Sequence, residues 1–200
     1  MKTIKIAATA VVALAVLTAC GESSESAATP AEAAPTPASS SAPAANIVQP
    51  ATNELMGEST ADGAKAFLHH VFELKSYALQ TGDIEALLAS LDGADAAVAD
   101  AESIKAIYDD GGWILGGQPK VKQILITTPA DEVAEGVEVE AVIPVNPSAY
   151  TEFDESGEAQ ETRPFDAAGS IYSATVVYTE GEWKATYLEE TPDAELPAAE

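Results

Sequence analysis

The chain has 200 residues, with 33 acidic and nine basic residues and a formal net charge of −24 at pH 7. That length suits one globular domain with an additional segment. We expect no nucleic-acid partner, because binding phosphate needs clustered Lys or Arg. Solubility is the simplest explanation of the acidity, and attraction of cations or of a basic partner is the alternative.

The first 19 residues have the pattern of a secretory signal. Lys2 and Lys5 give a positive start, and an uncharged run follows over residues 6–16. A membrane-spanning helix needs about 20 apolar residues, so this run is too short to span and has the length of a signal-peptide core. The sequence predicts a signal peptide over residues 1–19.

The run ends in Leu17-Thr18-Ala19-Cys20-Gly21, which resembles the lipobox of bacterial lipoproteins. In lipoproteins a diacylglyceryl group is attached to this Cys, and the leader is cut before it. Cys20 is the only cysteine, so it is the predicted lipidation site and no internal disulfide is expected. The resemblance implies that the chain is anchored in the membrane through its lipid, on the outer face of the cytoplasmic membrane. An ordinary secretory signal with an incidental cysteine is the alternative.

Residues 20–60 are rich in Ala, Ser, Pro and Thr. From residue 21 onwards this segment has no aromatic residue, Lys or Arg. Such a composition cannot bury enough apolar surface to offset the entropy of an ordered chain. The sequence predicts a disordered tether that holds the domain away from the lipid surface.

Three helices are predicted after the tether. Ser59 and Asp62 resemble a capping box, and apolar residues then recur at helical spacing through Gln80. Gly82 suits the end of this helix and Asp83 suits the start of the next. A third helix ends before Gly111. The predicted buried faces comprise Ala64, Phe67, Leu68, Val71, Leu74 and Ala78, then Ile84, Leu87, Leu88 and Leu91, then Ala97, Ala101, Ile104 and Tyr108.

Past Trp113 the apolar period changes to two, which predicts strands. Strand candidates cover residues 121–128, 137–145, 171–179 and 183–188, and the last two flank a hairpin at Glu180-Gly181. Pro144 predicts a sheet edge or a bulge. Residues 146–168 are predicted to form a long loop with a short strand near residues 150–153. Helices followed by antiparallel strands predict an α+β domain over residues 61–190, with an acidic tail over 191–200.

Several short motifs resemble a family of uncharacterised actinobacterial lipoproteins that is known only as a domain of unknown function. The resemblance covers roughly residues 60–190, and its members usually carry two cysteines where residues 90–95 here have none. The order of elements is also similar to the NTF2-like, or cone, fold. That resemblance implies three N-terminal helices packed on a bent antiparallel sheet with a pocket at its open end. The motifs are Ala66-Phe67, Tyr77-Ala78, Thr81-Gly82-Asp83, Ile104, Tyr108, Gly111-Gly112-Trp113 and Gly116-Gly117.

Four residues are candidates for the lining of that pocket: Tyr108, Asp109, Trp113 and Asp83. Asp109 falls at the end of the third helix, where an acid opposes the macrodipole, and unfavourable local chemistry can mark a functional site. Tyr108 and Trp113 would then line the pocket mouth. A glycine-rich turn with solvated acids is the alternative at Asp109, and helix capping is the alternative at Asp83.

The remaining candidates carry weaker signals. His69 and His70 have only Glu73 as a partner at helical spacing, so we expect surface or half-buried histidines and no metal site. The acidic stretch 131–161 lacks the order of an EF-hand loop. No nucleophile triad or nucleotide motif is present, so we assign no catalytic residue and no cofactor.

These observations favour a non-catalytic binding or accessory domain of the cell envelope, whose partner is an envelope protein or a small ligand. A second hypothesis is a cone-fold enzyme, similar to isomerases or dehydratases, that acts on a small apolar molecule with Asp83 or Asp109 as base. A third is a cation-binding acidic envelope protein.

Overall fold

The structure is a computed structural model that describes residues 33–146, 148–192 and 194. The predicted signal peptide, Cys20 and most of the acidic tail lie outside the described residues. No helix in the part of the chain that is described is long and apolar enough to cross a membrane.

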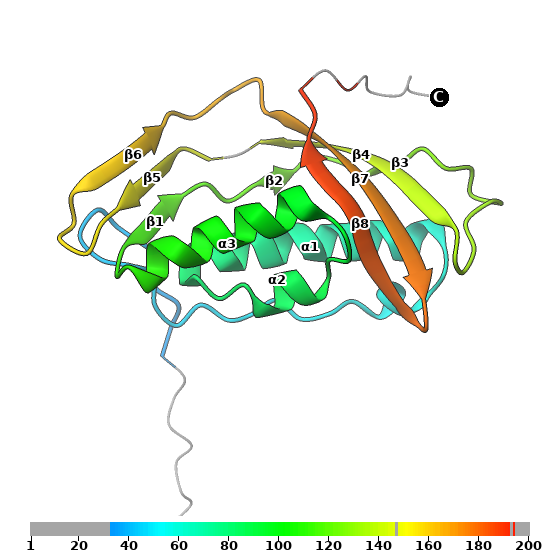
Figure 1. Cartoon of the computed structure of the whole chain (residues 1–200), viewed down its shortest axis with the longest axis horizontal. Helices are drawn as coiled ribbons and strands as arrows, with labels where there is room; N and C mark the ends of the chain where they lie inside the picture. The colour runs from blue at the N-terminus through cyan, green and yellow to red at the C-terminus, as the bar shows by residue number, and fades with distance from the viewer. Residues whose placement is uncertain (1–32, 147, 193, 195–200) are drawn as a thin grey trace, which may run out of the picture. The chain divides into compact units, whose positions relative to one another are not determined.

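The helices precede most of the sheet, as expected (Figure 1). They are the short 3-10 helix η1 (Glu54–Gly57), α1 (Ala61–Thr81), α2 (Glu85–Ala89) and α3 (Asp95–Asp109). The predicted apolar stripe of α1 is buried, and Leu68 and Val71 are at most 1% exposed. The three predicted helices are therefore confirmed, and α1 carries most of the helical part of the core.

The ends of α1 show how local chemistry positions it. Thr60 is the N-cap, and its side chain accepts a hydrogen bond from the Gly63 N–H at 3.0 Å. The predicted capping role of Ser59 is wrong by one residue, since the Ser59 hydroxyl is buried without a partner among the described residues. At the other end Gly82 takes a φ of 73° and its N–H bonds to the Ala78 carbonyl, as its sequence position indicates.

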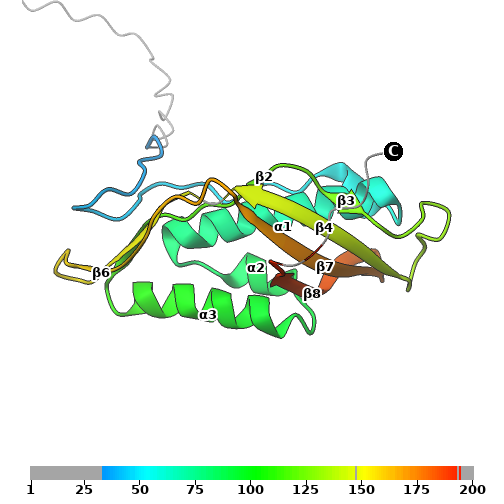
Figure 2. The ribbon, with the colours of Figure 1, turned by 90° about the horizontal axis from the view of Figure 1, so that it is seen from above.

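Two antiparallel sheets together form a curled half-barrel beside α1 (Figures 1 and 2). The three-stranded sheet has the order β1-β5-β6, and the other has the order β2-β4-β7-β8, with β3 also pairing with β4. This arrangement confirms an α+β fold with a bent antiparallel sheet. The strands are β1 (Trp113–Gly116), β2 (Lys120–Val121), β3 (Leu125–Ile126), β4 (Glu138–Asn146), β5 (Tyr150–Phe153), β6 (Ala159–Arg163), β7 (Ser170–Thr179) and β8 (Glu182–Glu190).

Strand β4 has the alternation that the sequence predicts, with every second residue from Val139 to Val145 buried. The prediction that Pro144 marks an edge or a bulge is wrong, because β4 lies between β2/β3 and β7 and its register with β7 is unbroken at Pro144↔Ile171. The Pro144 carbonyl accepts from the Lys122 N–H, so its backbone faces the gap between β2 and β3. The missing N–H therefore removes no bond to β7.

Two other strand predictions need correction. The single strand expected over 121–128 is split into β2 and β3, which pair with different parts of β4. The loop expected over 146–168 contains β5 near its expected place and also β6, which pairs with β5. All five residues of β6 are exposed, so it has no apolar alternation by which to recognise it. The β7–β8 hairpin is confirmed, and its Glu180-Gly181 turn has positive φ at both residues.

Residues 34–58, called the strap below, differ from the disordered tether expected up to residue 60. The strap runs along α1 on the side opposite α3 (Figure 2). The Trp113 indole N–H donates to the Ser39 carbonyl at 2.9 Å, and the Trp183 indole N–H donates to the Glu58 carbonyl at 3.1 Å. Tyr178 donates its hydroxyl to the Gly57 carbonyl at 2.6 Å. The prediction is wrong for this part because side chains of the core donate hydrogen bonds to backbone carbonyls of the strap, and Met56 of the strap packs against the core.

Candidate ligand-binding cleft

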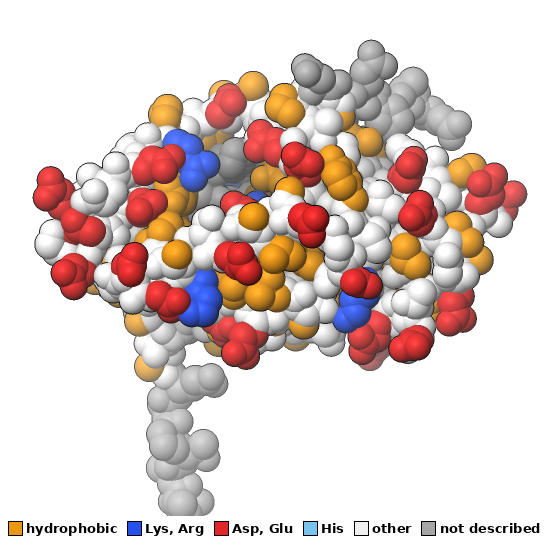
Figure 3. All heavy atoms as spheres, viewed as in Figure 1, with side chains coloured by type: hydrophobic (Ala, Val, Ile, Leu, Met, Phe, Trp, Pro, Cys, Tyr) orange, Lys and Arg blue, Asp and Glu red, His pale blue; other side chains and the backbone are white. Residues whose placement is uncertain are grey.

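A cleft of about 490 Å³ lies where the two sheets meet above α1 and α3. This volume is in the range of small-molecule sites. Figure 3 shows this face of the molecule hollowed between β6 and β8, with acidic side chains around the hollow. The side chains that line the cleft include Lys75, Leu79, Asp100, Ser103, Ile104, Ile107, Tyr150, Glu152, Glu161, Arg163, Asp166, Tyr172 and Glu190.

Lys75 enters the cleft from α1 with only 18% of its side chain exposed. Its ammonium lies 2.7 Å from the Asp100 carboxylate of α3 and 5.2 Å from the centroid of the Tyr172 ring. Burial lowers the pKa of Lys75, but the combined effect of Tyr172 and Asp100 outweighs it and holds the pKa above its usual value. Lys75 is therefore a fixed positive charge at neutral pH.

Arg163 and Tyr150 form a second cation–aromatic pair on the opposite wall. They are cross-strand neighbours on β6 and β5, and the guanidinium carbon lies 4.1 Å from the Tyr150 ring centroid. Arg163 also contacts the Glu161 carboxylate at 3.1 Å. The Tyr150 hydroxyl donates to Glu152 at 3.3 Å, and burial together with the Glu152 charge raises the pKa of Tyr150 to about 12.

Neither Lys75 nor Tyr150 has a pKa suited to proton transfer at neutral pH. A general acid or base works best with a pKa near the operating pH. Lys75 and Tyr150 both have a pKa raised from values that already lie far above neutrality. The cleft therefore offers constant charges and hydrogen-bond donors to a ligand.

Tyr108 and Trp113, two of the expected pocket residues, pack inside the domain. The Tyr108 hydroxyl donates to the Leu79 carbonyl at 2.9 Å, and burial raises the pKa of Tyr108. Trp113 is 6% exposed and stacks on Phe153 with ring centroids 5.1 Å apart. Neither side chain lines the cleft, because Tyr108 packs between the end of α1 and β1, and Trp113 contacts β5 and the strap.

Asp109 and Asp83, the other two expected residues, lie in solvent. Asp109 pairs with Lys105 one turn earlier on α3, which offsets its unfavourable place at the helix end. Asp83 accepts hydrogen bonds from the Tyr77 hydroxyl and from the Glu85 N–H, so it serves the start of α2 from one residue before the N-cap position. The structure therefore does not bring the four residues together.

The residues that do meet in the cleft were missed in the sequence. One signal was available, because Lys75 is a lone cation on the buried stripe of α1, one turn from Val71 and from Leu79. A cation at such a position needs a partner. Arg163 lies on the exposed strand β6 and carries no comparable signal.

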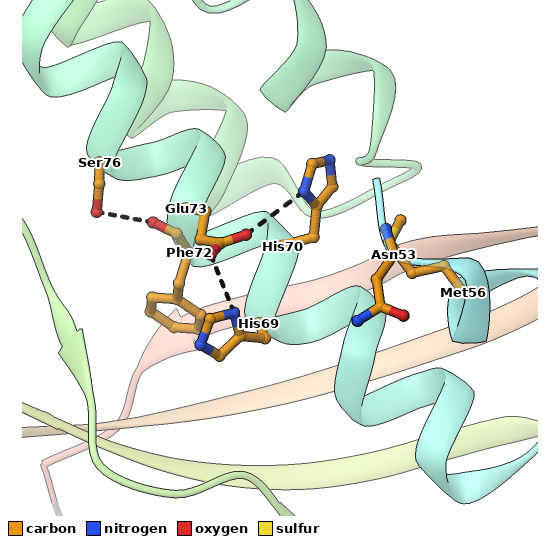
Figure 4. A network of polar contacts seen from close by, with 7 residues as sticks. All are labelled: Asn53, Met56, His69, His70, Phe72, Glu73 and Ser76. Atoms are coloured by element: carbon orange, nitrogen blue, oxygen red, sulfur yellow. Dashed lines mark hydrogen bonds and ion pairs between the residues drawn. The ribbon is translucent and has the colours of Figure 1, made fainter. Parts of the chain in front are cut away.

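The histidine pair forms a separate polar cluster beneath the strap (Figure 4). His69 and His70 approach Glu73 at 3.4 and 3.7 Å from either side. His70 is 7% exposed and its Nδ1 has no hydrogen-bond partner among the described residues, whereas His69 is exposed. No group of three His, Cys, Asp or Glu residues in residues 33–146, 148–192 and 194 is arranged to hold a metal ion. The cluster borders a hollow of about 570 Å³ with Asn53 of the strap on its other side.

The comparisons with known proteins bear on the family. A search of curated proteins found no match. A crystal structure of the intermembrane space region of the chloroplast protein ARC6 is similar to part of the chain, with 16% sequence identity and a TM-score of 0.46. The similarity covers 66% of this chain and 97% of that one. A family model described as "Family of unknown function (DUF6318)" matches residues 35–189, which include most of the strap and every residue of the cleft except Glu190. The chain therefore belongs to this family of unknown function, DUF6318.

Proposed function

We propose that the protein is a lipid-anchored binding domain of the cell envelope, which uses the cleft to hold a small ligand or a segment of a partner protein without reacting with it. The anchor is Cys20, at the end of a leader with the pattern of a lipoprotein signal. A membrane partner through this lipid and a location outside the cytoplasmic membrane follow from that pattern.

The observation that supports the binding role is that both cations of the cleft are paired with a carboxylate and a tyrosine ring. Lys75 and Arg163 are each held by a carboxylate and by a tyrosine ring, in a hollow of about 490 Å³. Fixed charges on rigid elements suit recognition. Apolar side chains of α1 and α3, such as Leu79 and Ile104, complete the surface that a ligand would contact.

We extend the proposal to the fold and the source. Three helices that precede a bent antiparallel sheet, with a hollow on one side, support an NTF2-like fold. The motifs around Thr81-Gly82-Asp83 and Gly111-Gly112-Trp113 support a relationship to actinobacterial lipoproteins.

The other two functions have less support. An enzyme that uses Asp83 or Asp109 as base would need an enclosed apolar pocket around that carboxyl, and both side chains are exposed. For a cation-binding acidic loop, the central carboxylate is Asp154. It already accepts hydrogen bonds within the β5–β6 turn, from the Ser156 hydroxyl at 2.6 Å and from Gln160 at 2.7 Å. These bonds lower the pKa of Asp154 and give it a structural role in the turn.

Native mass spectrometry of the protein, extracted gently from its own membrane, tests the proposal. We expect a chain that begins at Cys20, carries acyl mass and retains a bound molecule. Ser103→Trp places a large ring at the rim of the cleft from an exposed position on α3, and it should abolish retention. Glu102→Trp is the matched control, since Glu102 is exposed and does not line the cleft.

Two results would count against the proposal. A chain that begins elsewhere and carries no lipid contradicts the anchor. Equal retention by the Ser103→Trp and Glu102→Trp variants contradicts the cleft as the binding site.

A further inference from the structure

We propose that the cleft is selective for a cation, an ammonium or guanidinium group carried on an apolar chain. The inference rests on the proposed function in so far as it takes the cleft to be a binding site. It adds the chemical class of the ligand, which neither the family nor the leader indicates.

The first argument is that the cleft already holds two such groups. Lys75 provides a largely buried ammonium beside a tyrosine ring and a carboxylate. Arg163 provides a guanidinium beside the same two kinds of group, with 63% of its side chain exposed. The two sites come from different elements, α1 and β6. A negative aromatic face together with a carboxylate is the standard environment for an organic cation.

The second argument is that Lys75 reports the local electrostatic potential. With 18% of its side chain exposed, its ammonium loses most of its hydration, and burial alone favours the neutral amine. The surrounding groups reverse that preference and keep the pKa of Lys75 above its usual value. The groups that offset the cost of desolvating this ammonium are the Asp100 carboxylate at 2.7 Å and the Tyr172 ring, whose centroid lies 5.2 Å away.

The third argument is that negative charge remains after these cations are paired. Asp100 pairs with Lys75 and Glu161 pairs with Arg163. Glu152, Asp166 and Glu190 also line the cleft, and in the described part of the chain no Lys or Arg nitrogen lies within 4.0 Å of their carboxylates.

The sign of this remaining charge decides the class of ligand. An anion would approach three carboxylates without basic partners, and both cations are already neutralised. A cation would gain attraction from each carboxylate, and most from the half-buried Glu152, because Asp166 and Glu190 are exposed and their charges are screened more by salt. Leu79, Ile104 and Ile107 provide the contacts for its apolar chain.

Isothermal titration calorimetry of the full-length protein tests this inference with probes of matched length. Cadaverine is a five-carbon dication, and glutarate is a five-carbon dianion. We expect cadaverine to bind at one site and glutarate to show no heat of binding. N-acetyl-Lys-Lys-amide presents the same ammonium groups on a peptide. Tighter binding of this dipeptide would identify a segment of a partner protein as the source, and tighter binding of cadaverine would identify a free amine.

Two triple variants separate the cleft from the general acidity of the chain. Glu152→Gln, Asp166→Asn and Glu190→Gln together remove the three carboxylates without basic partners from the cleft. Asp131→Asn, Glu132→Gln and Glu135→Gln remove the same charge from exposed positions outside the cleft. We expect the first triple variant to weaken cadaverine binding by about tenfold, and the second by less than about twofold, because exposed distant charges are screened by salt.

Equal weakening by the two triple variants would overturn the inference, and so would binding of glutarate at the cleft. An absence of binding by both cationic probes would also overturn it. If the native mass spectrum then showed a neutral or anionic molecule that Ser103→Trp displaces, the proposed binding function would stand and only the ligand class would be wrong. If no molecule were retained and no probe bound, both would fall.

Discussion

The ring of Tyr108 lies against the backbone of Gly82, where a Cβ atom would overlap the ring. Gly82 also has a φ of 73°, which costs an L-residue about 1–2 kcal/mol. We predict that Gly82→Ala lowers the free energy of unfolding by about 2–4 kcal/mol, because overpacking adds to the backbone cost. Urea unfolding followed by circular dichroism measures this change in the free energy of unfolding.

Gly136→Ala is the control for that substitution. Gly136 has a φ of 77° and nothing within 4 Å of the added Cβ, so this variant carries the backbone cost alone. We expect a loss of about 1 kcal/mol. Equal losses at Gly82 and Gly136 would show that the Tyr108 ring moves aside freely.

The hydroxyl of Tyr150 makes stability depend on alkaline pH. Its pKa is raised from 10.0 to about 12, so the unfolded chain loses this proton at lower pH than the folded chain. The contribution of the protonated Tyr150 hydroxyl to the free energy of unfolding is therefore fully present below pH 10 and is lost as the pH rises toward 12. We predict that the free energy of unfolding falls by about 2 kcal/mol less in Tyr150→Phe than in the wild type between pH 10 and pH 12. Urea unfolding at a series of pH values measures this difference. Parallel curves for the two proteins would contradict the prediction.

At the scale of elements, the strap provides hydrogen-bond acceptors for buried side chains of the domain, although it contributes few apolar side chains to the core. Trp113, Trp183 and Tyr178 each donate a hydrogen bond to one of its carbonyls. We predict that a chain beginning at Ser59 is less stable than one beginning at Ala33 by about 3 kcal/mol or more, because buried donors lose their partners. Thermal and urea unfolding of the two chains, with matched buffers, measure the difference. Equal stability would show that water replaces the strap carbonyls at little cost.

At the scale of the whole molecule, self-repulsion opposes folding. The chain carries a net charge of −24, and its ion pairs among the described residues lie mostly at partly exposed positions. We predict that raising NaCl from about 10 mM to about 300 mM raises the Tm by about 3 °C, because screening weakens the repulsion between carboxylates more than it weakens a few exposed pairs. A fall in Tm would show that attractive pairs dominate. Potassium chloride should give the same rise, since the effect needs no specific cation.

Sequence patterns predicted the elements whose side chains repeat with a regular period. The stripe of α1, the alternation of β4 and the Glu180-Gly181 hairpin depend on neighbours along the chain, so they were visible before the fold was known. Strand β6 and the strap were missed for one physical reason. Backbone groups of both accept or donate hydrogen bonds, to β5 in the case of β6 and from Trp113 and Trp183 in the case of the strap, and such bonds leave no mark on composition.

The prediction of a leader and of a lipidation site at Cys20 comes from the sequence by itself, because an export signal acts through local composition and order. The α+β class also followed from the order of periodic segments. Only the tertiary structure decided which residues form the cleft. Lys75, Asp100, Arg163 and Tyr172 come from four elements. Apart from Lys75, none of these side chains stands out from its neighbours along the chain. The ion pairs and cation–aromatic contacts form only when the sheets curl over α1 and α3.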